Sequence, residues 1–114
     1  MKNSILAASL AAVMLMAPTT QVQAADIAQN LCNYISADDK KRLRSFLKTN
    51  KLKIRGVFKG VACNGMDLLA FADSRGSVET GSLIIAKLPK KIVPANMGSV
   101  SNPELLAAAK KRIG

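Results

Sequence analysis

Histidine and tryptophan are both absent from this 114-residue chain. Without histidine, the chain lacks the commonest general base, the commonest metal ligand, and the base of Ser-His and Cys-His nucleophilic sites. Its glycines match neither the P-loop nor the dinucleotide-binding fingerprint. We therefore expect no metal ion, no cofactor and no enzymatic activity.

Acidic residues are also scarce, with seven Asp and Glu against 17 Lys and Arg. Paired carboxylates are the remaining route to hydrolysis. Six of the acids lie at or near predicted helix starts, where the helix dipole favours them: Asp26, Asp38, Asp39, Asp67, Glu79 and Glu104. Asp73 falls late in its predicted helix, and we expect it to form a surface ion pair with a nearby arginine. The hydrolase alternative requires a concave site that contains Asp73 and a second acid.

Aromatic residues make up only 4% of the chain, which leaves few platforms on which bases can stack. We therefore do not expect a nucleic-acid partner. The two cysteines, Cys32 and Cys63, do not form the Cys-x-x-Cys arrangement of redox enzymes.

The first 24 residues have the composition of a secretory signal peptide. Lys2 supplies one positive charge, an apolar run extends over residues 5–16, and Val22-Gln23-Ala24 is a small-x-small cleavage site. The run is too short to span a bilayer comfortably. We predict cleavage after Ala24 and a periplasmic location, with an uncleaved membrane anchor as the alternative.

Removal of the signal peptide leaves one small domain, and a domain of this size is marginally stable without a covalent staple. Export places Cys32 and Cys63 in an oxidising compartment, and two cysteines allow only one intramolecular pairing. We predict a Cys32–Cys63 disulfide, with two buried free thiols as the alternative.

Hydrophobic periodicity predicts a mostly α-helical fold that contains two stacked helical hairpins. In the first hairpin, one helix starts at Asp26, where Gln29 completes a capping box. The next helix starts at Ser36 and ends at Asn50 in a left-handed residue. Residues 52–55 then alternate apolar and basic side chains, so we expect a short extended finger between the hairpins.

The second hairpin spans residues 67–88. Asp67 caps its first helix, Gly76 takes the left-handed conformation that ends this helix, and Ser77 caps the next one. Pro89 stops the second helix, because proline cannot continue it.

The rest of the chain divides into two segments. Residues 94–101 have the small, polar composition of a linker, and residues 102–114 form a last helix that Asn102 caps. The predicted organisation is thus a signal peptide (1–24), a disulfide-stapled helical domain (25–93), the linker and the C-terminal helix.

A basic run is the most unusual feature of the sequence, with nine Lys or Arg and no acid between residues 40 and 59. The predicted helix and the finger share these charges, so we expect them to converge on one side and to attract anions. Eight of them form the predicted anion- or partner-binding surface: Lys40, Lys41, Arg44, Lys48, Lys51, Lys53, Arg55 and Lys59.

We predict a non-enzymatic periplasmic binding module whose basic surface meets an envelope protein or an anionic lipid or lipopolysaccharide surface. One alternative is a basic face that only keeps a small domain in solution. Another is a structural or inhibitory protein that binds an envelope protein through apolar surface at the open end of the helical stack.

The second hairpin resembles an ankyrin repeat. Gly65 and Gly76 stand in register with that pattern, and Leu69 and Ala72 lie between them. The resemblance implies two stacked helical hairpins with an extended finger between them. Gly81 departs from the pattern, since an apolar residue is usual at this position.

A second resemblance covers most of the chain after the signal peptide. The stretch from Leu31-Cys32-Asn33 through Cys63-Asn64-Gly65 to Lys87-Leu88-Pro89 resembles a domain-of-unknown-function family of short exported bacterial proteins. This resemblance implies an exported location and no particular activity.

Overall fold

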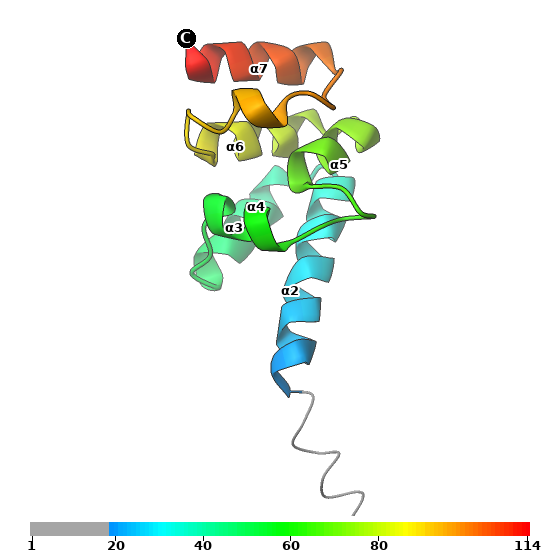
Figure 1. Cartoon of the computed structure of the whole chain (residues 1–114). Helices are drawn as coiled ribbons and strands as arrows, with labels where there is room; N and C mark the ends of the chain where they lie inside the picture. Colours follow the sequence, from blue (N-terminus) through cyan, green and yellow to red (C-terminus); the bar gives the residue numbers. More distant parts are fainter. Residues whose placement is uncertain (1–18) are drawn as a thin grey trace, which may run out of the picture.

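The computed structural model describes residues 19–114 of the chain, with side chains described from residue 25. The helices are α2 (Thr19–Ser36), α3 (Lys40–Thr49), α4 (Ile54–Gly60), α5 (Leu68–Arg75), α6 (Val78–Lys87), the 3₁₀ turn η1 (Pro94–Asn96) and α7 (Pro103–Ile113) (Figure 1). These residues contain no β-strand, so the predicted mostly α-helical fold is confirmed. Most of the predicted signal peptide, residues 1–18, lies outside the described residues.

Two helical hairpins pack side by side, as predicted. The first consists of α2 and α3 and the second of α5 and α6; α2 packs against α5, while α3 packs against α6. The last helix, α7, packs on α6 (Figure 1). Because α6 also contacts α4, it is the central helix of the domain.

The buried core runs through all of these layers. Its members are Leu31, Ile35, Leu43, Leu47, Ile54, Cys63, Leu68, Leu69, Phe71, Ala72, Leu83, Ile84, Ile85, Leu88, Val93, Val100, Leu105 and Ala109. Gly81 permits the close contact between α6 and α7, because a Cβ at this position would lie 2.6 Å from Cδ2 of Leu105. The packing of α7 thus explains why a glycine replaces the expected apolar residue.

Three predicted helix boundaries in the first hairpin are wrong. Helix α2 starts at Thr19 and passes through Asp26, because a continuing helix overrides a local capping box. Helix α3 is capped by Asp39, whose Oδ1 accepts a hydrogen bond from the Arg42 amide at 3.0 Å, and not by Ser36. At the other end of α3, Asn50 has φ −94°, and the left-handed residue is Lys51 (φ 54°).

The predicted extended finger is wrong, because residues 54–60 form helix α4. Four alternating residues are too few to exclude a helix, and no neighbouring strand is present in the described range to pair with them. The apolar side chains Ile54, Val57, Phe58 and Val61 recur at helical spacing, and all four are buried or half-buried in the core.

The predicted disulfide is confirmed. Cys32 on α2 is bonded to Cys63, which precedes α5, and their Cα atoms lie 5.7 Å apart. A tight turn at Asn64 and Gly65, both with positive φ, returns the chain so that the backbone of Cys63 pairs with that of Met66. The disulfide therefore ties the start of the second hairpin to the first.

At the junction of the two hairpins, a side chain of each hairpin forms hydrogen bonds with backbone groups at a helix end of the other. The Asp38 carboxylate accepts hydrogen bonds from the Thr80 amide (2.8 Å), the Thr80 hydroxyl (3.1 Å) and the Glu79 amide (3.3 Å). In return, the Ser77 hydroxyl donates to the carbonyl of Ile35 at 2.6 Å, near the end of α2. Ser77 does occupy the predicted N-cap position of α6, but the capping carboxylate comes from the other hairpin.

In the second hairpin, the other predicted boundaries are confirmed. The Asp67 carboxylate accepts from the Ala70 amide at 2.7 Å, and Gly76 ends α5 in the left-handed conformation (φ 66°). Helix α6 ends at Lys87, just before Pro89.

Helix α7 is fastened at both ends. Near its start, Asp73 accepts hydrogen bonds from the amides of Ser101 (3.1 Å) and Asn102 (2.8 Å), so the predicted Asp73–arginine ion pair is wrong. Asn102 caps α7 as predicted. Near its end, the Arg112 guanidinium donates to the carbonyl of Leu88 at 3.1 and 3.4 Å.

Loss of the disulfide is predicted to destabilise the domain substantially. The bridge closes a loop with a sequence separation of 31 residues. In the Cys32→Ala/Cys63→Ala variant, we expect the free energy of unfolding to fall by about 3–4 kcal/mol, since the unfolded chain gains entropy. Urea unfolding of the variant and the oxidised wild type measures the difference. An unchanged midpoint with an unchanged urea dependence would contradict the prediction.

Removal of the Asp73 carboxylate is predicted to loosen α7. Asp73→Ala leaves the Ser101 and Asn102 amides without their shared acceptor, so we expect a loss of about 1–2 kcal/mol in stability. Hydrogen exchange of the α7 amides should accelerate more than that of α3. Asp73→Asn, which keeps one acceptor oxygen, should recover part of the effect, whereas equal exchange in all three proteins would refute this role.

Candidate anion-binding site

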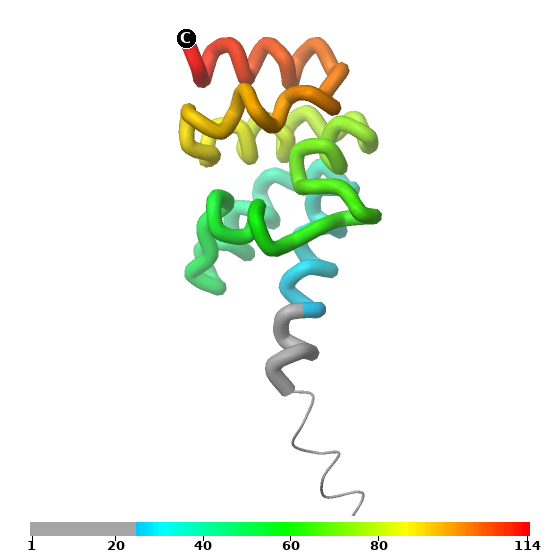
Figure 2. Tube along the Cα trace, in the orientation of Figure 1, coloured from blue at the N-terminus to red at the C-terminus, as the bar shows by residue number. Residues whose placement is uncertain are grey.

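Three helices of the domain run in the same direction, and this arrangement gathers their basic ends. Near the starts of α3 and α6, the Lys40 ammonium lies 3.8 Å from the Glu79 carboxylate. Near their ends, Lys48 and Lys87 line one hollow. Helix α7 is also parallel to α6, because the connecting segment returns along α6 before α7 begins (Figure 2).

Each of these helices carries basic residues in its last turn, where the negative end of the helix dipole favours them. Acids gather at the opposite end: Asp39 caps α3, Asp38 caps α6, Glu79 lies in the first turn of α6 and Glu104 in that of α7. Parallel packing therefore brings the basic last turns of the three helices to one side, although α3 also has three cations, residues 40–42, in its first turn.

A hollow of about 490 Å³ lies among α3, α4 and α6, and we call it the basic cleft. Its cationic side chains are Arg44, Lys48, Lys53, Arg55 and Lys87, and its apolar side chains are Leu47, Leu52, Ile54 and Leu83. No acidic side chain lines it. The volume falls within the range of about 300–1,000 Å³ that is typical of small-ligand sites.

The basic cleft joins a buried apolar floor to an exposed charged rim. Leu47, Ile54 and Leu83 are only 8%, 3% and 5% exposed, whereas all five cationic side chains belong to exposed residues. The aliphatic stems of Lys and Arg can cover such a floor while their charged ends stay in water. A concave surface that holds one sign of charge over a low-dielectric floor concentrates its field on an incoming anion.

The structure brings four of the eight predicted binding residues into the basic cleft: Arg44, Lys48, Lys53 and Arg55. The other four do not line it: Lys41, Lys51 and Lys59 are exposed elsewhere, and Lys40 pairs with Glu79. Sequence reasoning missed Lys87, which lies 28 residues beyond the end of the basic run. The sequence did indicate that Lys87 lies in the last turn of a helix. It did not indicate the direction of that helix relative to α3, on which the position of Lys87 in the cleft depends.

Three further hollows surround the domain, and no acidic side chain lines any of them. One lies between α6 and α7, a second lies beside the disulfide, and a third, of about 520 Å³, is a mainly apolar hollow between η1 and α7. Asp73 lines none of these and instead fastens α7, so the site that the hydrolase alternative requires is not found at these hollows.

Neither a cluster of metal ligands nor a membrane-spanning helix is present among the residues that the structure describes. Residues 19–114 contain no group of three or more His, Cys, Asp or Glu side chains that could hold a metal ion. In the same range, no helix has both the length and the apolar character needed to cross a bilayer.

Comparison with known proteins places the chain in a family. No curated protein and no solved structure matches it significantly, so the resemblance to ankyrin repeats remains a prediction. The family model described as "Protein of unknown function (DUF3718)" matches residues 31–107, a span that includes both cysteines, the whole basic cleft and the start of α7 up to residue 107. The chain therefore belongs to this domain family of unknown function, as the cysteine and asparagine pattern had indicated.

Proposed function

We propose that this chain is a non-enzymatic periplasmic module that binds an anionic partner of the cell envelope in the basic cleft. One observation carries the proposal. Five cationic side chains surround an apolar floor, and no acidic side chain lines the cleft with them. Two of the five come from α3, one from the α3–α4 connection, one from the first turn of α4 and one from α6.

The arrangement of charge favours a binding role over mere solubility. A basic face that only keeps a domain in solution needs no concave shape, and its charges gain nothing from convergence. Here, cationic side chains from helices distant in sequence line one hollow. Because like charges repel, their proximity lowers the stability of the folded domain. An anionic partner offsets that repulsion.

The periplasmic part of the proposal depends on two features. The first 24 residues have the pattern of a secretory signal peptide. The Cys32–Cys63 disulfide suits an oxidising compartment, because disulfides are rare in reducing ones.

A second candidate function is supported by the apolar hollow between η1 and α7. Leu106 and Ile113 are 40% and 45% exposed and line this hollow with Met97. An envelope protein that covers these side chains would form a complex that survives high salt, whereas binding at the basic cleft weakens as salt rises.

The test of the basic cleft is a pair of charge-matched variants. Lys53→Gln/Lys87→Gln removes two cations that only the fold brings together, and Lys41→Gln/Lys59→Gln removes two exposed cations outside the cleft. Each basic residue near an anionic bilayer contributes about 1 kcal/mol. We therefore expect the cleft variant to bind vesicles of phosphatidylglycerol and phosphatidylcholine about thirtyfold more weakly than wild type, and the control much less so.

Vesicle co-sedimentation at about 0.05 M and about 0.5 M salt measures both effects. Wild-type binding should be strong at the lower concentration and largely lost at the higher one. Equal losses in the two variants would show that only net charge matters, and an absence of wild-type binding to this probe at low salt would remove the proposal.

A further inference from the structure

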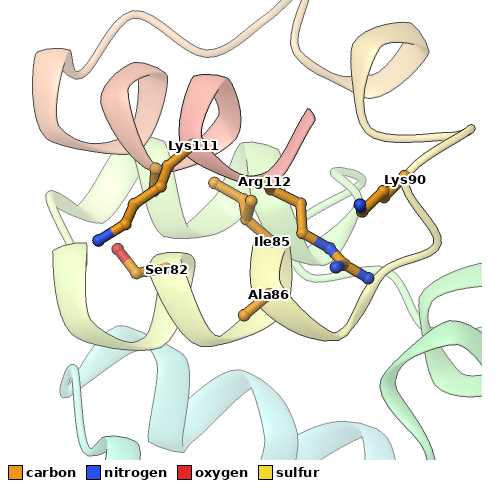
Figure 3. A pocket seen from close by; sticks show the side chains of 7 residues that line it. Ser82, Ile85, Ala86, Lys90, Lys111 and Arg112 are labelled. Atoms are coloured by element: carbon orange, nitrogen blue, oxygen red, sulfur yellow. The ribbon is translucent and has the colours of Figure 1, made fainter. Parts of the chain in front are cut away.

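A second cationic hollow lies between α6 and α7, and we call it the α6–α7 hollow. It has a volume of about 380 Å³ and is lined by Ser82, Ile85, Ala86, Lys90, Ala108, Lys111 and Arg112 (Figure 3). Three of these side chains are cationic, one is a hydroxyl and the other three are apolar. None of the three cations belongs to the basic run of residues 40–59.

The polar groups lie at two ends of this hollow. Figure 3 shows the Lys111 ammonium beside the Ser82 hydroxyl at one end, and Lys90 with the Arg112 guanidinium at the other. Ile85 and Ala86 lie between the two pairs. The hollow thus has positive charge at each of its two ends and apolar side chains between them.

Arg112 is already held in place. Its Nε and Nη2 donate to the carbonyl of Leu88, which leaves the other guanidinium donors free. A cation fixed by one contact loses less conformational entropy when it forms another. The Arg112 end of the hollow is therefore prepared for an anion before one arrives.

The basic cleft and the α6–α7 hollow flank the same half of α6. Leu83 and Lys87 line the basic cleft, while Ser82, Ile85 and Ala86 line the α6–α7 hollow. Helical periodicity places these two sets on different sides of α6. One partner with several anionic groups can therefore contact the domain on both sides of its central helix.

We infer that the α6–α7 hollow is a second anion-binding site, and that the partner presents several closely spaced phosphate groups. The inference deepens the proposed function and depends on it for a shared partner, but it uses different residues. Phosphate suits each end of the site better than carboxylate, because its additional oxygens can accept from two donor groups at once. These groups are the Lys111 ammonium and the Ser82 hydroxyl at one end, and the Lys90 ammonium and the Arg112 guanidinium at the other. Two sites on one domain also raise the affinity for a multivalent partner far above that for a single anion.

The experiment compares three variants that each lose two positive charges. Lys90→Gln/Lys111→Gln alters the α6–α7 hollow, Lys53→Gln/Lys87→Gln alters the basic cleft, and Lys41→Gln/Lys59→Gln is the control. Arg112 is left unchanged because it contacts Leu88 and contributes to the packing of α7. Thermal unfolding followed by circular dichroism checks that each variant retains its fold.

Three probes identify the chemistry and its source. Vesicles of phosphatidylglycerol and phosphatidylcholine present phosphates at a membrane surface, long-chain polyphosphate presents them in solution, and polyglutamate of matched length presents carboxylates. The α6–α7 variant should lose about thirtyfold in affinity for the phosphate probe that the wild type binds, and the control should lose far less. Preference for vesicles or for polyphosphate then tells a lipid source from a soluble one.

The outcomes separate the inference from the proposed function. If only the cleft variant is impaired beyond the control, the α6–α7 site is refuted and the basic cleft stands. If only the α6–α7 variant is impaired, the basic cleft is refuted and this site stands. Equal losses in all three variants, or no binding of the wild type to any probe, overturn both sites. Binding of polyglutamate as tight as that of polyphosphate overturns the phosphate assignment and favours an acidic protein.

Discussion

The contact between the Asp38 carboxylate and the first turn of α6 fixes how the two hairpins meet. The first amides of a helix have no partner within the helix, and here Asp38, from the other hairpin, accepts from two of them, those of Glu79 and Thr80. In the opposite direction, the Ser77 hydroxyl of the second hairpin donates a hydrogen bond to the Ile35 carbonyl near the end of α2. Since both groups are at least partly buried, loss of either partner would leave a polar group unpaired, which makes the pairing specific as well as stabilising.

The charge distribution of the domain follows from this junction. The starts of α3 and α6 are held together and their last turns line the same cleft, so both helices end on the same side, and α7 joins them because it lies parallel to α6 (Figure 1). Helices α6 and α7 carry an acid in the first turn and bases in the last, in agreement with their dipoles, whereas α3 has an acidic cap, Asp39, but three cations in its first turn. Local sequence preference, repeated in the last turns of three parallel helices, thus gathers basic side chains on one side of the domain. The basic cleft and the α6–α7 hollow both lie along the basic half of α6.

The sequence predicts this fold best where the determining interaction is local. The Asp67 cap, the left-handed Gly76 and the end of α6 depend on a few neighbouring residues, and all were predicted. Residues 54–60 were not, because a four-residue alternation and a helical period coexist there and only tertiary packing selects the helix. Lys87 could not be assigned to the basic cleft, because its place there depends on the direction of α6. That direction depends in turn on a cap that Asp38 supplies from 42 residues earlier in the chain, and no local sequence pattern encodes such a contact.

The most direct test of this account is hydrogen exchange of the Thr80 amide, followed by NMR in the wild type and in Asp38→Gly. Glycine tolerates the left-handed backbone of residue 38 (φ 53°), so the variant removes the carboxylate without adding backbone strain. Thr80 is the third residue of α6, and Asp38 supplies the acceptor for its amide. The account predicts slow exchange of this amide in the wild type and fast exchange in the variant. Fast exchange in the wild type, or slow exchange in both proteins, would contradict it.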